Sequence, residues 1–240
     1  MNDFFIKPEW PVSSDIHAVT TLRTGGFSRG VYASMNPASH VGDNPLAVLR
    51  NRKVLAERLR LPGEPFWLNQ VHGNRVIDAG KIGPRTADAS FTYDQGVVCL
   101  VLTADCLPVL LCNPITGAIA AVHAGWRGLL LGVIEAALEA IGDYRIAWLG
   151  PAIGPDAFVV GSEVRDRFLA KSQLFDSAFR PGDAKKWLLD LYAIARTILS
   201  EKGVGFIGGG EWCTYSDPQR FFSYRRDGNC GRLATLIWRE

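Results

Sequence analysis

Residues 96–114 read GVVCLVLTADCLPVLLCNP, which is two apolar runs separated by a short polar break. Each run has the length of a strand whose two faces are both buried. Asn113 and Pro114 supply a turn after the second run. The stretch therefore predicts two buried strands, joined by a break over 103–106 that places Asp105 and Cys106 in apolar surroundings.

The flanking segments alternate between expected strands and expected helices. Residues 44–61 have the apolar spacing of an amphipathic helix that begins near Asn44-Pro45 and ends before Pro62. Residues 117–142 predict a strand ending at His123, a tight turn, and a helix of about 3 to 4 turns. Residues 186–203 predict a periodic helix closed by Gly203.

Other segments predict further strands, so the order is mixed. Residues 66–80 predict two short strands joined around 72–74, and 211–238 predict strands with loops between them. No strict alternation of strand and helix appears. The pattern indicates an α+β fold of stacked layers with mixed sheets.

The composition limits the class of protein. The chain has 240 residues without an internal repeat or a linker, which predicts one domain over 1–240. A net charge of +2 without a basic cluster gives no indication of nucleic-acid binding. No signal peptide and no apolar stretch of about 18 residues are found, so we expect a cytoplasmic protein without a membrane segment. Small-molecule substrates and a monomer or weak homo-oligomer are expected.

Three side chains interrupt apolar segments in the same way. His72, Cys106 and His123 each end an apolar segment beside small or turn-forming residues, where scaffolds commonly carry chemistry. A thiolate and two imidazoles suit Zn²⁺ with a fourth position open to water or substrate. The long spacings make this a weak signal by itself. Taken one at a time, a cysteine in an apolar run is more often a small buried hydrophobe, and a histidine at a strand end is more often a hydrogen-bonded structural group.

Further polar residues are candidates for substrate contacts. Asp105 needs partners inside an apolar run, and it either orients a ligand histidine or caps a turn. Arg127 near an expected helix start, and Arg23 in a Gly-rich turn, suit an anion. Tyr224 precedes two arginines and could stack on a ligand. Solvated surface positions are the alternative for all of these except Asp105.

Eight segments together resemble one known family. They are LRTGGFSRGVYASMN, HVGDNPLAVLRNRKVLA, WLNQVHG, ADASFT, TADCLPVLLC, AAVHAGWRGL, LGPAIGP and FFSYRRDGNCGRLATLIW, in this order. The chain resembles the bacterial YfiH family, also called the laccase-domain or polyphenol oxidase family, and in some bacteria the peptidoglycan editing factor. The resemblance extends from about Val19 to Trp238.

The resemblance implies both a fold and a site. It implies a single α/β/β/α layered domain, and a zinc-capable site at His72, Cys106 and His123. It also implies a purine nucleoside phosphorylase acting on adenosine, inosine and 5′-methylthioadenosine, with some adenosine deamination. Copper-dependent polyphenol oxidation and editing of peptidoglycan precursors are the other activities that the family name carries.

The residues allow these activities to be compared. In phosphorolysis, we expect Arg23 and Arg127 to bind phosphate, and Trp126 and Tyr224 to hold the base, with Phe221 as a further stacking candidate. The general acid or base is expected to be Asp105 or Asp88.

Two other kinds of chemistry are open. Cys106 paired with a histidine could act as a metal-independent cysteine amidase. Only four histidines and no H-x-H motif are present, so several coppers could not be held, although one Cu²⁺ could replace Zn²⁺. A binding module with a structural metal is disfavoured, because such sites usually have four protein ligands.

Overall fold

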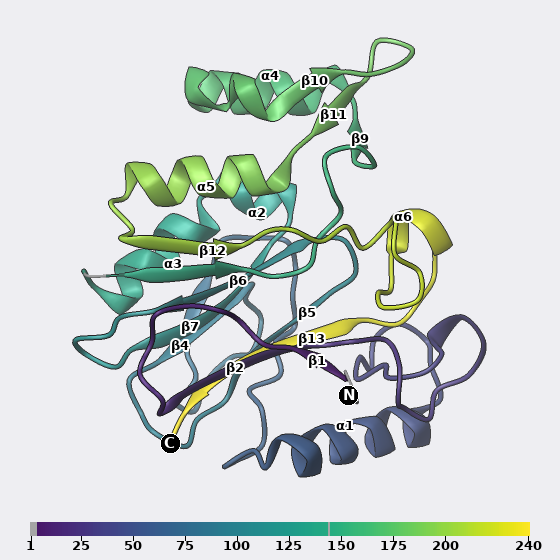
Figure 1. Cartoon of the computed structure of the whole chain (residues 1–240), viewed down its shortest axis with the longest axis vertical. Coiled ribbons are helices and arrows are strands. Elements are labelled where there is room, and N and C mark those ends of the chain that lie inside the picture. Colours follow the sequence, from purple (N-terminus) through teal and green to yellow (C-terminus); the bar gives the residue numbers. More distant parts are fainter. Residues whose placement is uncertain (1–3, 144) are drawn as a thin grey trace.

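Two stacked β-sheets form the centre of the molecule (Figure 1). The computed structural model describes residues 4–143 and 145–240. The smaller central sheet is antiparallel, with the strand order β1-β2-β13-β5. Its strands are β1 (Phe5–Ile6), β2 (Ile16–Thr21), β5 (Cys99–Thr103) and β13 (Leu233–Arg239).

The larger central sheet is mixed, with the strand order β12-β8-β6-β7-β4-β3. The pairs β12–β8 and β3–β4 are parallel, and the other pairs are antiparallel. Its strands are β3 (Val76–Asp78), β4 (Ala89–Thr92), β6 (Leu107–Cys112), β7 (Ile119–Ala124), β8 (Ile146–Leu149) and β12 (Phe206–Gly209).

Strand β6 shows why residues 107–112 are apolar throughout. Leu107, Val109 and Leu111 belong to the core between this sheet and the helices. Leu110 and Cys112 belong to the core between the two sheets. Both faces of the strand are therefore buried, and no position along it tolerates an exposed polar side chain.

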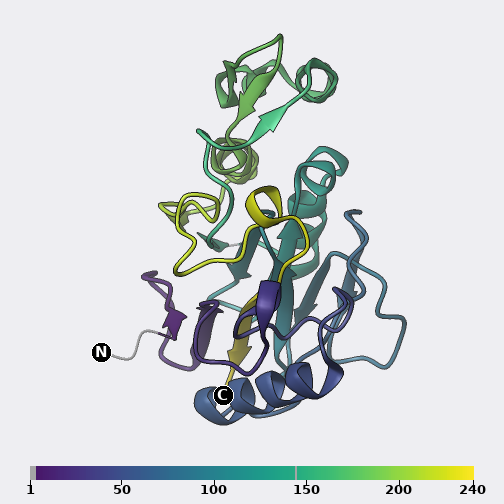
Figure 2. The same cartoon turned by 90° about the vertical axis from the view of Figure 1, so that its right-hand side faces the viewer.

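Helices cover the outer faces of both sheets (Figures 1 and 2). Helix α1 (Pro45–Leu59) lies against the smaller sheet, and Asn44 caps it by accepting hydrogen bonds from the backbone N–H groups of Leu46 and Ala47. The larger sheet is covered by α2 (Trp126–Leu131), α3 (Val133–Ile141) and α5 (Leu191–Glu201). The α/β/β/α layers that the family resemblance implies are confirmed, with one mixed sheet and one antiparallel sheet.

A third, small sheet projects beyond these layers. It has the order β10-β11-β9, with β9 (Val159–Val160), β10 (Phe179–Pro181) and β11 (Trp187–Leu189). Helix α4 (Ser162–Lys171) and the 3₁₀ helix η2 (Gln173–Ala178) pack on it. Its buried side chains, including Phe168 and Leu189, join the core under α3 and α5 in one continuous cluster.

The structure differs from the sequence expectations in four places. The helix expected after His123 is two helices, because Gly132 adopts a φ of +90° between α2 and α3. The helix expected over 186–203 begins only at Leu191, since Asp190 caps it and the preceding residues form β11. The segment 66–69 makes only isolated bridges, and 224–227 form a short helix.

The remaining elements are short. They are the 3₁₀ helix η1 (Gly30–Tyr32) and the helix α6 (Tyr224–Asp227). No helix among the described residues is long and apolar enough to span a bilayer.

Candidate active site

The polar break 103–106 is the point where the chain passes from one central sheet to the other. β5 ends at Thr103 in the smaller sheet, and β6 begins at Leu107 in the larger one. Asp105, in the middle of the break, has a φ of +90°. Such a backbone conformation is unfavourable for a residue with a side chain and needs external support.

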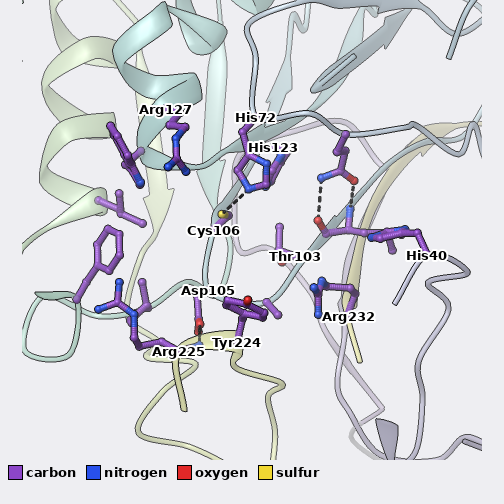
Figure 3. A pocket seen from close by; sticks show the side chains of 17 residues that line it. His40, His72, Thr103, Asp105, Cys106, His123, Arg127, Tyr224, Arg225 and Arg232 are labelled. Atoms are coloured by element: carbon purple, nitrogen blue, oxygen red, sulfur yellow. Dashed lines mark hydrogen bonds between the residues drawn. The ribbon is translucent and has the colours of Figure 1, made fainter. Parts of the chain in front are cut away.

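Asp105 receives that support from the C-terminal part of the chain. Its Oδ1 accepts a hydrogen bond from Thr214 Oγ1 at 2.6 Å, and its Oδ2 accepts one from the backbone N–H of Arg225 at 2.6 Å. Its carbonyl oxygen accepts a hydrogen bond from the N–H of Ile153. These bonds satisfy the buried carboxylate and hold the break in place, with Cys106 directed to a cavity (Figure 3).

Cys106 lies beside the two histidines that the sequence singles out. The ligand atoms of His72, Cys106 and His123 all lie within 4.8 Å of one another. Cys106 Sγ is 3.8 Å from His72 Nε2, and the two imidazole rings meet edge to face with 4.8 Å between centroids. His123 is buried at the end of β7, Cys106 is half-buried, and His72 is exposed to the cavity.

One buried carboxylate holds both histidines. Asp88 Oδ1 accepts hydrogen bonds from His123 Nδ1 and from the backbone N–H of His72, both at 2.8 Å. Asp88 Oδ2 accepts hydrogen bonds from the N–H groups of Gly73 at 2.7 Å and Val71 at 3.2 Å. The loop is thereby held with His72 at a φ of +60°, and the His123 ring presents Nε2 to the site.

These contacts also determine the charges in the cluster. Burial alone would raise the pKa of Asp88, but the hydrogen bonds from His123, Gly73 and His72 bring it below its ordinary value. Burial acts in the same direction on Cys106, yet the two imidazoles lower the pKa of its thiol to about 6. The pKa of His123 is raised to about 9, because the thiolate and Asp88 outweigh its burial.

The cluster fits a metal ion. A thiolate and two imidazoles are ligands that Zn²⁺ prefers, and Asp88 supplies the second partner that a ligand histidine usually has. Gly125 leaves room beside them: a Cβ there would lie 2.9 Å from Cys106 Sγ and 3.2 Å from His72 Cδ2. With three protein ligands, a bound ion would keep a further position for water or substrate.

The cavity has a volume of about 490 Å³. Of the residues expected from the sequence, it brings together His72, Cys106 and His123, called the triad below, with Asp105, Trp126, Arg127 and Tyr224. Arg127 is stacked over the Trp126 ring, 4.4 Å from its centroid.

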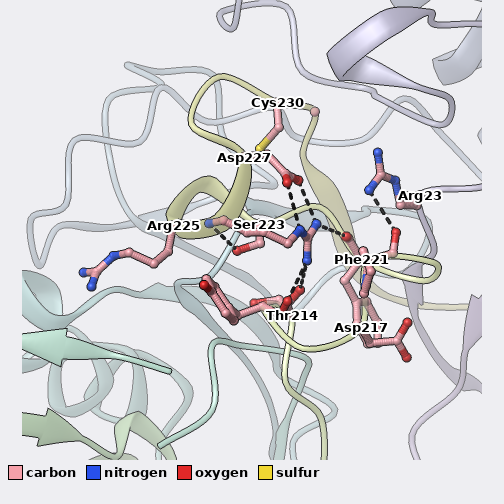
Figure 4. Close-up of polar contacts among 12 residues, drawn as sticks. Arg23, Thr214, Asp217, Phe221, Ser223, Arg225, Asp227 and Cys230 are labelled. Atoms are coloured by element: carbon pink, nitrogen blue, oxygen red, sulfur yellow. Dashed lines mark hydrogen bonds and ion pairs between the residues drawn. The ribbon is translucent and has the colours of Figure 1, made fainter. Parts of the chain in front are cut away.

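Arg23 and Phe221 are not among the described residues that line the cavity. The Arg23 guanidinium donates to the carbonyl oxygens of Ala33 and Pro218, and Phe221 is fully buried. Arg226 pairs with Asp227 and donates to backbone carbonyls, whereas the Arg225 side chain lines the cavity (Figures 3 and 4).

The structure adds residues that sequence reasoning did not select. The Gln70 side-chain amide exchanges two hydrogen bonds of 2.8 Å with the backbone of Leu102, and this pairing anchors the loop that carries His72 to the edge of β5. The other added lining residues are His40, Leu102, Thr103, Ala104, Ile153, Phe158, Leu191 and Arg232. Gln70 belongs to the N-Q-V-H-G motif, and Thr103 and Ala104 belong to T-A-D-C, so these two motifs could have indicated three of the added residues.

Comparison with known proteins agrees with this fold. A family model described as "Multi-copper polyphenol oxidoreductase laccase" matches residues 17–240. A purine nucleoside phosphorylase of Pseudomonas aeruginosa is 45% identical, with 98% of each chain covered. The purine nucleoside phosphorylase YfiH of Escherichia coli is 47% identical, covering 97% of this chain and 98% of that one.

Solved structures are similar over almost the whole chain. A Neisseria meningitidis protein superposes with a TM-score of 0.95 at 44% identity, covering 99% of this chain and 100% of that one. YlmD of Geobacillus stearothermophilus gives a TM-score of 0.90 at 30% identity, with 100% and 97% covered. The chain therefore belongs to the YfiH family, whose model carries the laccase description and whose relatives include purine nucleoside phosphorylases.

Proposed function

We propose that the chain is a zinc-dependent purine nucleoside phosphorylase acting on adenosine, inosine and 5′-methylthioadenosine. The observation that carries this proposal is the His72–Cys106–His123 donor set, which opens into a cavity that also contains arginine and aromatic side chains. The names of the relatives at 45–47% identity support the same reaction class. A reducing compartment such as the cytoplasm suits the site, since Cys106 has to remain a free thiolate.

His72, Cys106 and His123 would hold the zinc ion, which when bound supplies a Lewis acid beside the substrate. Asp88 keeps His123 and the His72 loop in their ligand positions through its four hydrogen bonds. Asp105 acts in this proposal by fixing the direction of Cys106, because both of its oxygens already accept hydrogen bonds.

In phosphorolysis, a phosphate oxygen forms a bond to C1′ of the ribose while the bond from C1′ to the purine breaks. The electron pair of that bond leaves with the base, which takes up the proton given up by the hydrogen phosphate. The products are the free purine and the 1-phosphate of the sugar, which is ribose 1-phosphate when inosine or adenosine is the substrate. Arg127 and Arg225, which both line the cavity, would bind the phosphate. Arg225 is held for this by its hydrogen bond to the carbonyl of Val159 and by stacking on Phe158.

The purine needs an apolar surface and room. Trp126 and Tyr224 offer aromatic faces to the cavity, and aromatic stacking suits any purine. A cavity of about 490 Å³ lies within the range of small-molecule sites. Deamination of adenosine is proposed as a side reaction of the same site. Arg23 has no part in this proposal, because its guanidinium donates to backbone carbonyls elsewhere.

The experiment uses protein of defined zinc content with inosine, in the presence and absence of phosphate. Hypoxanthine and ribose 1-phosphate are quantified for the wild type, Cys106→Ala, and the control Cys213→Ala, whose half-buried thiol lies outside this cavity. We expect phosphate-dependent release in the wild type and the control but not in Cys106→Ala. Equal release with and without phosphate would refute phosphorolysis.

A metal-independent cysteine amidase that edits peptidoglycan precursors is the second candidate. The lowered pKa of Cys106 beside the raised pKa of His123 favours it, because a thiolate next to an imidazolium is an activated nucleophile. Exhaustive chelation separates the two functions. An amidase keeps its activity without metal, whereas the proposed phosphorylase loses it and regains it with Zn²⁺.

Copper-dependent polyphenol oxidation is suggested by the description of the family model. Of the four histidines in the sequence, two belong to the triad, His40 lines the opposite wall of the cavity outside the His72–Cys106–His123 cluster, and His17 stacks on Trp238. The triad therefore offers ligands for a single ion. One Cu²⁺ bound in place of Zn²⁺ is compatible with these ligands, and a set of several coppers is not.

A further inference from the structure

The cavity has a second cationic wall that the proposed phosphorolysis does not explain. Arg127 and Arg225 lie on one side of Cys106, and His40 and Arg232 lie on the opposite side (Figure 3). Attack of phosphate on a neutral nucleoside requires one anion site, and the first wall supplies it. The second wall therefore requires a separate explanation.

Arg232 is held in a fixed position at this wall. Its Nη1 donates to the carbonyl oxygens of Cys230 at 2.8 Å and Gly231 at 3.0 Å. Its guanidinium lies 5.9 Å from the centroid of the Tyr224 ring. No described carboxylate forms an ion pair with it, so its remaining N–H groups are available to an anion.

The nearby titratable groups leave this wall positive. Partial burial together with Arg232 and Arg52 lowers the pKa of His40, so its ring offers an N–H donor without adding charge. The two buried carboxylates nearest the cavity, Asp88 and Asp105, are occupied by hydrogen bonds to His123, Thr214 and the backbone. Neither of them balances the charge of Arg232.

Thr103 gives an independent indication of a ligand. Its side chain lines the cavity at the end of β5, it is 1% exposed, and its hydroxyl oxygen has no hydrogen-bond partner. A buried hydroxyl without a partner costs free energy and calls for an explanation. Among the cavity-lining residues that the structure describes, it is the one with such an atom.

We propose that Arg232, His40 and Thr103 form a second anion subsite that binds a phosphate group on the side of the triad opposite Arg127. This inference rests on the proposed function and extends its substrate class. The phosphate is carried by the ribose of a phosphorylated nucleoside, or it is free phosphate that uses this wall. Both sources present the same oxygens to the same donors, and the experiment distinguishes them.

The test is isothermal titration calorimetry on the zinc-loaded full-length protein with three probes: inosine, inosine 5′-monophosphate and inorganic phosphate. The variants are Arg232→Gln and Thr103→Val, and the control is Arg167→Gln, an exposed position on α4 with the same change of charge. Thr103→Val is expected to fold normally, because the deleted hydroxyl makes no hydrogen bond.

For Arg232→Gln we expect inosine 5′-monophosphate to bind about 10- to 100-fold more weakly, with inosine binding unchanged and the Arg167→Gln control binding every probe like the wild type. Thr103→Val should weaken binding of the monophosphate several-fold. If only the monophosphate is affected, the phosphate is that of the ribose; if inorganic phosphate is affected too, free phosphate binds there.

Three results would overturn the subsite. In the first, the wild type binds neither phosphate-bearing probe. In the second, both probes bind Arg232→Gln as tightly as the wild type. In the third, inosine loses as much affinity as the monophosphate, which would make Arg232 a residue that shapes the cavity.

Phosphorolysis of inosine is measured in parallel. If inosine is not cleaved but phosphate binding still depends on Arg232, the proposed function is wrong and the subsite stands. If inosine is cleaved but phosphate binding does not depend on Arg232, the proposed function stands and the subsite is wrong.

Discussion

Asp88→Asn is the substitution that tests most directly how the site is organised. The Asp88 carboxylate accepts four hydrogen bonds, two on each oxygen. An asparagine has one acceptor oxygen, so its NH₂ group must face either His123 Nδ1 and the His72 N–H, or the N–H groups of Gly73 and Val71. Two buried donors lose their acceptor in both orientations.

The magnitude follows from this count. Each buried donor left without an acceptor costs about 1–3 kcal/mol, so we expect the free energy of unfolding to fall by about 2–6 kcal/mol. Since one orientation releases the His123 ring and the other releases the His72 loop, zinc affinity should fall about 10- to 100-fold. The pKa of Asp88 is lower in the folded protein than its ordinary value. The ionised carboxylate therefore contributes its full share to the free energy of unfolding at pH values above the ordinary carboxyl pKa, and this share is lost as the pH falls through the lowered pKa.

Two measurements separate these effects. Urea unfolding of the metal-free protein gives the stability change, and competition with a chromophoric chelator gives the zinc affinity. Asp166→Asn, at an exposed position on α4, is the matched control. If Asp88→Asn binds zinc within twofold of the wild type while folded, Asp88 does not position the ligands and the reasoning fails.

Further predictions concern the triad. Gly125→Ala should lower zinc affinity and the rate of phosphorolysis at least tenfold, because the added Cβ would lie 2.9 Å from Cys106 Sγ. The control Gly83→Ala should change neither, because the space around Gly83 is open. In metal-free protein, alkylation of Cys106 followed by peptide mass spectrometry should rise through pH about 6, since the thiolate forms above its lowered pKa. His123→Ala should move that rise toward the ordinary thiol range, and an unchanged profile would contradict the assigned cause. Zinc should suppress the alkylation, and failure to do so would argue against Cys106 as a ligand.

Local features could be predicted from the sequence because their causes are local. The two apolar runs around 103–106 became β5 and β6, and Asn44-Pro45 began α1. Two boundaries were missed. Gly132 was hidden in a continuous apolar pattern, and the residues before Asp190 satisfy helical spacing although they pair in β11. In β11, pairing with neighbouring strands outweighs the helical spacing of the apolar residues, and the sequence by itself does not show which of the two structures forms.

The triad was apparent from the sequence, because His72, Cys106 and His123 each interrupt an apolar segment and together match family motifs. The partners of these residues were decided only by the tertiary structure. Asp105 accepts a hydrogen bond from Thr214, 109 residues away. The second cationic wall combines Arg232 with His40 and Thr103, which come from the N-terminal part and the middle of the chain. A charged group inside the protein needs hydrogen-bond partners, which can come from any part of the chain that lies nearby in the fold. The stacking of the two sheets determines which distant loops lie there, and no local sequence pattern encodes that stacking.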